Sequence, residues 1–185
     1  MPGEIEPTKL TKIRPVVPCL RTPSRADGSR IWELVRECAP LDENSMYCNL
    51  IQADHFGETC VVAEMKGDIV GWISGYIIPE STTLFVWQVA VGEKARGNGL
   101  GKTMLKHLLG RDACAEVTQL QTTITKDNGP SWALFRSFAS AIGGELSDAP
   151  HYKSEAHFAG HHKTEHMVTI ALDDASGLDA LKSAA

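Results

Sequence analysis

Apolar and polar positions along the chain follow two periods, a short one typical of strands and a longer one typical of helices. In the first half, Asp27 and either Asn44 or Ser45 are placed to cap two helices, and Pro40 ends the first of them. Lys66-Gly67-Asp68 separates two β-branched runs and predicts a hairpin turn. The elements predicted here are an edge strand at 12–17, helices at 27–38 and 44–51, and strands at 59–65, 69–78 and 83–91.

The second half of the chain alternates between helical and strand periods. Leucines spaced three or four residues apart predict an amphipathic helix after Gly99, Pro130 begins another helix, and Gly143-Gly144 closes it. The predicted elements are helices at 99–114 and 131–142 and strands at 117–124 and 166–172. Their order predicts an α/β fold, with a hairpin meander followed by βαβα units, in a single domain over residues 11–172. The polar or small residues of 1–10 and 173–185 predict flexible ends.

Composition and charge narrow the class of protein. The chain has 185 residues, of which 43% are hydrophobic and 22% charged, as in an ordinary globular domain. The net charge of -5 argues against nucleic acid as a partner, and no apolar run reaches the roughly 20 residues that span a membrane. Five cysteines without a CxxC pair indicate reduced thiols in a cytoplasmic protein, with no zinc or redox site.

The stretch from Leu84 to Thr103 carries the most chemical information, because an apolar strand runs into a glycine-rich turn and then into an amphipathic helix. Glycines let the backbone approach a ligand closely, and the free N–H groups at a helix start attract an anion. A phosphate-binding P-loop would need a glycine where the chain has Arg96, and Gly97 is one residue too close to replace it. A dinucleotide fingerprint would need a glycine where the chain has Lys102.

The spacing Arg96-x-x-Gly99-x-Gly101, followed by Asn128-x-x-Ser131-x-x-Leu134-Phe135, resembles the GNAT family of N-acetyltransferases. The resemblance implies an α/β GNAT fold, with a central mixed β-sheet flanked by helices on both faces. It also implies acetyl-CoA as co-substrate, no metal, and an oxyanion held by a backbone N–H near Val89. The residues implied to bind acetyl-CoA are Val89, Ala90, Val91, Arg96, Gly97, Asn98, Gly99, Leu100, Gly101, Lys102, Asn128 and Phe135.

One position departs from the family pattern. Members of the family commonly carry a tyrosine that protonates the thiolate of CoA, and the matching residue here is Phe135, which has no proton to give. Either another group protonates the sulfur, or the thiolate leaves unprotonated, which a thiol pKa of about 8.5 permits.

Four segments resemble the branch of this family whose members acetylate L-2,4-diaminobutyrate in ectoine biosynthesis. The segments are residues 40–50, 71–76, 87–91 and 122–135. The match over 40–50 is the most specific, because the early helices shape the acceptor pocket and vary most across the family. The resemblance implies transfer of the acetyl group to the side-chain N4 amine of this small diamino acid, by direct attack of the amine on the thioester. It also implies a cytoplasmic homodimer.

An amine acceptor places two demands on its pocket. The pKa of such an amine is about 10, so the site must hold an ammonium ion and remove a proton before the nitrogen can attack. In the GNAT family, the segments around Asp42 and Glu155 converge at the acceptor end of the central strand. We therefore expect Asp42 and Glu155 to bind the ammonium groups, and Glu155 or His157 to act as the base. The other candidate substrate contacts are Glu43, Tyr47 and Trp87.

Each acceptor candidate also has an ordinary structural interpretation. Asp42 could cap the following helix, and Glu155 could be a solvated loop charge. Trp87 and Tyr47 could be core side chains, because large aromatic residues dominate cores.

A histidine-rich segment and two alternative functions stay open at this point. Five of the seven histidines lie between His151 and His166, but Gly160 and poor helical periodicity favour structural or solvated histidines over a metal site. The alternatives to diaminobutyrate acetylation are a GNAT enzyme for a polyamine or basic amino acid, and a catalytically silent acyl-CoA-binding module. The first shares every predicted CoA contact, and the loss of tyrosine at Phe135 favours the second.

Overall fold

The computed structural model describes residues 17–39 and 41–172, which form seven strands and five α-helices. The strands are β1 (Cys19–Arg21), β2 (Val61–Met65), β3 (Asp68–Ile77), β4 (Thr83–Val91), β5 (Gln119–Thr125), β6 (Leu146–Tyr152) and β7 (Glu165–Ala171). The helices are α1 (Gly28–Glu37), α2 (Met46–His55), α3 (Leu100–Leu109), α4 (Gly129–Ile142) and α5 (Ser154–Phe158). The flexible ends predicted at 1–10 and 173–185 lie outside the described residues, as does the predicted strand at 12–17 apart from Val17.

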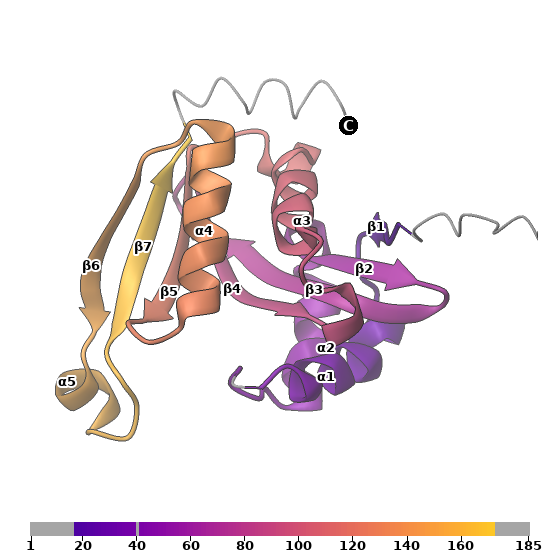
Figure 1. Ribbon diagram of the computed structural model, residues 1–185, viewed down its shortest axis with the longest axis horizontal. Helices are drawn as coiled ribbons and strands as arrows, with labels where there is room; N and C mark the ends of the chain where they lie inside the picture. The colour runs from indigo at the N-terminus through magenta and orange to yellow at the C-terminus, as the bar shows by residue number, and fades with distance from the viewer. Residues whose placement is uncertain (1–16, 40, 173–185) are drawn as a thin grey trace, which may run out of the picture.

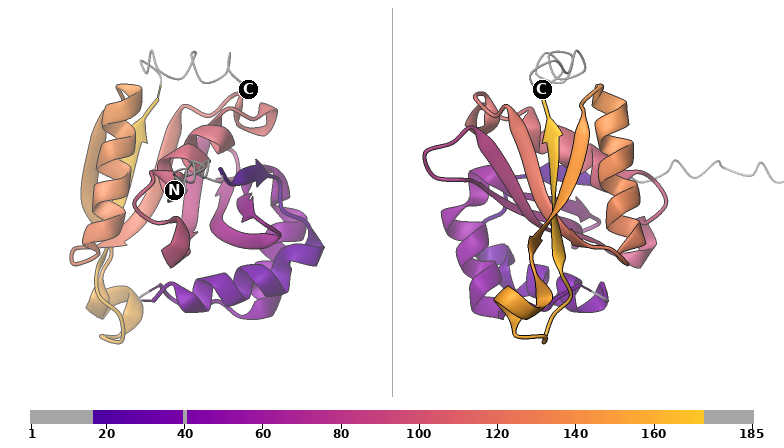
Figure 2. Two further views of the ribbon diagram at one scale, coloured as in Figure 1. Left: turned by 45° about the vertical axis from the view of Figure 1, so that its right-hand side comes forward. Right: turned by 90° about the vertical axis from the view of Figure 1, so that its left-hand side faces the viewer.

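The strands form one mixed sheet in the order β1-β2-β3-β4-β5-β7-β6 (Figure 1). Strands β4 and β5 are parallel, and every other neighbouring pair is antiparallel. Helices α3 and α4 cover one face of the sheet, and α1 and α2 cover the other (Figures 1 and 2). The predicted α/β fold, with a mixed sheet between two layers of helices, is confirmed.

Two cores, one on each face, hold these layers together. Leu105 and Leu108 of α3 pack with Phe138 of α4 in the larger core. On the other face, Ile31 of α1 packs with Trp72 of β3 in the smaller core. All five side chains are fully buried, and burying each large apolar side chain contributes roughly 1.5–3 kcal/mol.

Short-range signals define several helix ends. Ser45 caps α2 by accepting a hydrogen bond from the N–H of Cys48 at 3.1 Å, so Asp42 is not the cap of this helix. Asn128 caps α4 in the same way, accepting from the N–H of Ser131 at 3.1 Å. The α4 helix ends at Gly143, which has a left-handed φ of +74°.

The sequence analysis did not predict β6 and α5. All residues of β6 after Leu146 are exposed, and the strand contains Pro150, because it pairs only with β7 at the edge of the sheet. An edge strand that buries neither face needs no alternation of apolar residues, so the pattern on which strand prediction depends is absent. The α5 helix has only five residues, too few for a helical period. Figures 1 and 2 show α5 at the tip of the β6–β7 pair.

Strand β4 contains a β-bulge. Its register against β3 shifts between Val86 and Gln88, so Trp87 is the extra residue. Before the bulge, Val86 packs into the core beneath α3 and α4. After it, Ala90 packs into the core beneath α1 and α2. The bulge therefore changes which face of the sheet each later side chain of β4 points to.

A buried carboxylate ties β1 to the start of α1. Asp27 accepts two hydrogen bonds from Arg21 at 2.8 Å each and one from the N–H of Ser24 at 2.8 Å. Arg21 also bonds to Glu64 of β2 at 2.7 Å. Asp27 is the N-cap residue of α1 as predicted, but its side chain makes no cap hydrogen bond to this helix, because these bonds occupy the carboxylate. The hydrogen bonds from Arg21, more than any other contact, lower the pKa of Asp27 to about 2 although burial opposes them.

We expect Asp27→Asn to lower the free energy of unfolding by about 2 kcal/mol at pH 7. The reason is that the folded protein holds the pKa of Asp27 at about 2, well below its ordinary value, and so favours the carboxylate. A carboxylate with a depressed folded pKa stabilises the native state above its unfolded pKa. That contribution disappears as the pH falls through the folded value. Urea unfolding should therefore show the difference between wild type and variant closing between about pH 4 and pH 2. The control is Asp54→Asn, whose ion pair with Arg25 is exposed and should contribute less than about 1 kcal/mol. Equal losses in both variants would contradict this account.

Candidate active site

The parallel strands at the centre of the sheet separate after a short contact. Thr83–Phe85 of β4 pair with Gln119–Gln121 of β5, and within the described residues the later parts of these strands do not pair. Val89 and Val91 are half-buried there, and the side chain of Ala90 is fully buried. The edge of β4 that faces β5 can therefore offer N–H and C=O groups to an extended ligand.

The glycine-rich loop begins where β4 ends. Arg96 donates from Nε to the carbonyl of Val91 at 2.8 Å, and Asn98 donates to the carbonyl of Arg96 at 3.3 Å. Gly97 and Gly99 have left-handed φ angles of +79° and +72°, which glycine adopts without strain. Gly99 directly precedes α3, so the first amides of this helix, which lack intrahelical acceptors, point out of the loop. This arrangement suits a pyrophosphate.

Helices α3 and α4 approach closely beside the loop. A Cβ at Gly101 would lie 3.1 Å from a methyl carbon of Leu134, so this contact has little room for a side chain. Lys102 donates from Nζ to Ser137 of α4 at 3.0 Å, which places its ammonium between the helices. Phe135 is 2% exposed and belongs to the core, and Asn128 caps α4. The gap between β4 and β5, together with the loop, thus fits a donor with an amide-containing arm and a pyrophosphate.

The acceptor end of the site is a cluster of charged groups from distant segments. Asp42, in the loop between α1 and α2, lies 3.5 Å from Nε2 of His162. The same nitrogen lies 3.8 Å from a carboxylate oxygen of Glu165, the first residue of β7. The expected convergence of the early helical region with the segment before the last strand is therefore observed. It occurs at His162 and Glu165, which the sequence analysis did not single out.

The environment raises the pKa of both Glu165 and His162, for different reasons. Burial raises the pKa of Glu165, the charge of His162 opposes this, and Asp42 raises it again. One carboxylate oxygen of Glu165 is buried without a hydrogen-bond partner among the described residues. A hydrogen bond between Nδ1 and the carbonyl of Lys163, 2.8 Å long, raises the pKa of His162 against the effect of burial. Asp42 and Glu165 raise it further, so a cation is favoured between the two carboxylates.

The aromatic candidates are exposed, which excludes the core interpretation for both. Tyr47, in the first turn of α2, is 70% exposed, and Trp87, at the bulge of β4, is 51% exposed. Glu43 forms an exposed ion pair with Arg36 at 3.6 Å, which directs its carboxylate towards α1. Asp42 has an almost fully solvent-exposed side chain apart from its contact with His162.

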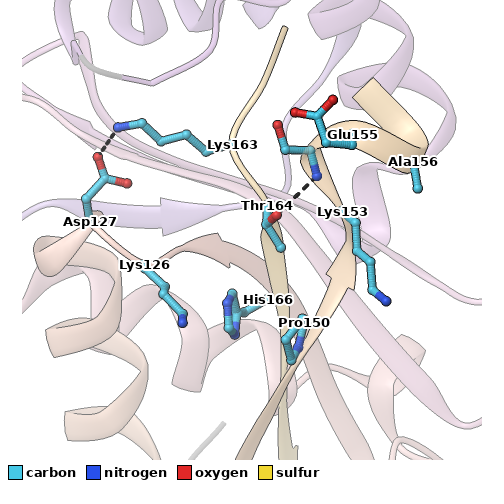
Figure 3. A pocket seen from close by; sticks show the side chains of 10 residues that line it. Lys126, Asp127, Pro150, Lys153, Glu155, Ala156, Lys163, Thr164 and His166 are labelled. Atoms are coloured by element: carbon cyan, nitrogen blue, oxygen red, sulfur yellow. Dashed lines mark hydrogen bonds and ion pairs between the residues drawn. The ribbon is translucent and has the colours of Figure 1, made fainter. Parts of the chain in front are cut away.

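Glu155 and His157 occupy a different place from the one expected. Both lie on α5, and His157 accepts a hydrogen bond at Nδ1 from the N–H of Lys153, the residue before the helix, at 2.8 Å. Glu155 lines an open pocket of about 770 Å³, across from Lys126 (Figure 3). His166 also lines this pocket, so Glu165, the residue before it on β7, points to the opposite face. The expected grouping of Glu155 with Asp42 is not observed.

The histidine segment resolves into separate environments. His157 bonds to the backbone N–H of Lys153, His162 joins the cluster with Asp42 and Glu165, and His166 is buried beside Asp148, with 3.1 Å between Nδ1 and the carboxylate. His151 and His161 are exposed. Within residues 17–39 and 41–172, no three His, Cys, Asp or Glu side chains are grouped in a way that could hold a metal ion. No helix in this part of the chain is long and apolar enough to cross a membrane.

Residues 29–139 match the model of the acetyltransferase (GNAT) family. The L-2,4-diaminobutyric acid acetyltransferase of Vibrio parahaemolyticus serotype O3:K6 is 48% identical over 153 residues, which cover 82% of this chain and 84% of that protein. The protein of the same name from Methylotuvimicrobium alcaliphilum is 46% identical over 152 residues, which cover 82% of this chain and 88% of that protein.

Solved structures give the same family likeness. The diaminobutyrate acetyltransferase of Paenibacillus lautus, in complex with its substrate L-2,4-diaminobutyric acid and coenzyme A, has a TM-score of 0.81 and 38% identity. The match covers 85% of this chain and 96% of that one. Ard1 from Thermoplasma volcanium has a TM-score of 0.66 at 18% identity, covering 85% of this chain and 100% of that one, a likeness of fold alone.

Proposed function

Because the chain belongs to the GNAT acetyltransferase family, we propose that it transfers the acetyl group of acetyl-CoA to the side-chain N4 amine of L-2,4-diaminobutyrate. This is the acetylation step of ectoine biosynthesis. The extent of the likeness carries the proposal, because proteins named for this substrate match more than four fifths of the chain at 38–48% identity. Of the two solved structures described above, the Paenibacillus lautus enzyme in complex with coenzyme A and the diamino acid has the higher TM-score.

The donor half of the proposed site combines the strand gap and the glycine loop. The exposed backbone edge of Val89–Val91 binds the pantetheine arm, and a backbone N–H near Val89 stabilises the oxyanion. The amides from Gly97 to Lys102 bind the pyrophosphate, and Arg96 adds positive charge at the start of the loop. Asn128 lies at the start of α4 with its amide nitrogen free for the arm, because its oxygen makes the cap.

The acceptor half is the cluster of Asp42, His162 and Glu165. Asp42 holds the ammonium form of the diamino acid, and His162 occupies the cation position between the two carboxylates before the substrate enters. Trp87 and Tyr47 form exposed apolar walls around the carbon chain. Glu155 and His157 are left out of this site, because among the described residues neither makes a hydrogen bond or an ion pair with Asp42, whereas His162 and Glu165 form the charged cluster with it. Glu43 is left out because it pairs with Arg36.

Glu165 is the proposed general base. It accepts one proton from the N4 ammonium, directly or through water, and the neutral nitrogen attacks the thioester carbonyl. The C–N bond forms as the C–S bond breaks, sulfur leaves as the CoA thiolate, and the second nitrogen proton passes to solvent. Since Phe135 is buried in the core, no residue at that position protonates the thiolate, which is a fair leaving group with a thiol pKa of about 8.5.

The larger organisation is part of the same proposal. One acetyltransferase domain spans residues 11–172, and the enzyme acts in the cytoplasm as a homodimer. The five cysteines make no disulfide among the described residues, as in a reducing compartment. A mass in solution equal to that of one 20.1 kDa chain would contradict the homodimer.

We expect the purified protein to acetylate L-2,4-diaminobutyrate at N4 with a kcat/KM at least about tenfold above that for ornithine, lysine, putrescine or spermidine. Each amine is incubated separately with acetyl-CoA, and fragmentation in the mass spectrometer locates the acetyl group. Faster turnover of another amine would keep the acetyltransferase assignment and overturn the acceptor. Tight acetyl-CoA binding without turnover of any amine would indicate a silent acyl-CoA-binding module.

A further inference from the structure

Gln88 connects the central strand to the loop that carries Asp42. It lies on β4 directly after the bulge, and its side chain is buried, with 7% of the residue exposed. Its amide nitrogen donates to the backbone carbonyl of Asp42 at 2.9 Å, and its amide oxygen accepts from the side chain of Asn44 at 3.4 Å. The buried amide of Gln88 thus bonds to two positions of the loop over residues 41–45, which we call the acceptor loop.

The β-bulge at Trp87 decides where this amide points. If β4 kept Trp87 in a regular ladder without a bulge, position 88 would share the face of Val86, beneath α3 and α4. With it, position 88 shares the face of Ala90, towards α1 and α2. The bulge therefore leaves Trp87 exposed and directs the buried side chain of Gln88 towards the loop that carries Asp42.

At its start, this loop is held by Leu41, which packs against the smaller core. The ion pairs of residues 42 and 43 lie on its exposed side. Glu43 pairs with Arg36 at 3.6 Å, and both side chains are more than half exposed. Asp42 meets His162 through a carboxylate that is almost fully exposed. Exposed ion pairs contribute little, since solvent and salt screen them and both side chains lose freedom. Among the described hydrogen bonds and ion pairs of residues 42–44 with the rest of the chain, those made by the buried side chain of Gln88 are the least exposed, and both are partly buried.

We propose that Gln88 is a positioning residue for the acceptor, because its bonds to Asp42 and Asn44 fix the acceptor loop against the strand that binds the donor. The inference rests on the proposed function and adds to it a specificity element outside the charged cluster. Gln88 bonds to the backbone of Asp42 and not to the carboxylates of Asp42 and Glu165 or the ring of His162. Its role is to fix the position of the Asp42 backbone, and with it the carboxylate, relative to β4. Substrate affinity therefore depends on an uncharged residue between Trp87 and Val89, at the junction of the donor and acceptor halves.

The first experiment measures both substrates in Gln88→Met, which keeps the size of the side chain and removes its amide. We expect the KM for diaminobutyrate to rise about tenfold, while kcat changes less than about threefold and the Kd of acetyl-CoA less than twofold. A KM within twofold of wild type would overturn the proposal. Equal weakening of both substrates would also overturn it, because it would indicate a general support of β4. Gln88→Asn, which keeps an amide but shortens it, is the second variant should Gln88→Met not fold, with an expected threefold or larger rise in KM.

A double-mutant cycle separates positioning from a merely structural role. Since Gln88 acts through Asp42, the double variant Asp42→Ala/Gln88→Met should have the same KM as Asp42→Ala alone, within twofold. Multiplying effects would contradict the proposal. Backbone ¹⁵N relaxation of residues 41–45 tests, without any substrate, whether Gln88 restrains the acceptor loop. We expect the order parameters of residues 41–45 to fall in Gln88→Met, while those of residues 96–101 stay unchanged. Unchanged order in the acceptor loop would overturn the inference even if diaminobutyrate proved not to be the acceptor. Wild-type inactivity towards diaminobutyrate would instead overturn the proposed function.

Discussion

Replacing Glu165 by glutamine is expected to lower kcat for diaminobutyrate acetylation by about 10²- to 10³-fold, the usual contribution of a positioned general base. Glutamine keeps the size and the hydrogen-bonding oxygen of the side chain, but it cannot accept the ammonium proton. The fold should be retained, because Glu165 lies at the start of a strand, its side chain is 16% exposed, and its ion pair with His162 is 3.8 Å long. Steady-state kinetics with saturating acetyl-CoA measures the loss.

The pH profile gives the same prediction a second readout. Burial raises the pKa of Glu165 above the ordinary value for a glutamate, and the base is active only when ionised. In the wild type, kcat/KM should therefore fall as the pH decreases through that raised pKa, in addition to the slope from protonation of the free amine. Glu165→Gln should retain only the slope from the amine.

The matched control is Glu155→Gln, on α5 and outside the acceptor cluster. We expect its kcat to stay within about threefold of wild type. A large loss in Glu155→Gln with a small loss in Glu165→Gln would restore the earlier expectation and refute the assignment of the base. The same rate in both variants would show that neither carboxylate removes the proton.

Gly99→Val is expected to weaken acetyl-CoA binding by about 30-fold or more while the protein stays folded. Valine at a φ of +72° costs about 1–3 kcal/mol, so the loop will rearrange to relieve the strain. A Cβ at this position meets nothing within 4 Å, which means that backbone strain, and not a clash, produces the effect. Because Gly99 directly precedes α3, rearrangement turns the free amides of the first turn away from the pyrophosphate. Isothermal titration with acetyl-CoA measures the change.

Gly67→Val is the matched control for this variant. Gly67 also has a left-handed φ, of +88°, and no atom within 4 Å of an added Cβ, but it lies in the turn between β2 and β3. We expect the two variants to lose similar stability, and only Gly99→Val to lose acetyl-CoA affinity. Similar Kd values for Gly99→Val and wild type would contradict the assignment of this loop to the pyrophosphate.

Most of the fold follows from local sequence. Helices α1, α2, α3 and α4 and strands β2 to β5 and β7 lie where the periodicity predicted them, within a few residues except at the end of α3. That helix ends at Leu109, five residues before the predicted end, because Gly110 begins a turn. Caps and turns are determined by residues within four positions of one another, so Ser45 and Asn128 could be identified as helix starts from sequence. Strand β6 could not, because an exposed edge strand carries no hydrophobic pattern.

The sequence by itself predicted the donor site and the chemistry that the proposed acceptor requires. The glycine loop is contiguous from Arg96 to Gly101, so its spacing is visible without a structure. The tertiary structure decided which residues form the proposed acceptor site, because Asp42 and His162 meet in space although most of the chain separates them in sequence. It also decided which face each side chain occupies. A strand alternates its faces residue by residue, so pairing of β7 with β5 and β6 turned Glu165 and His166 to opposite sides, and a single bulge in β4 turned Gln88 towards the substrate loop.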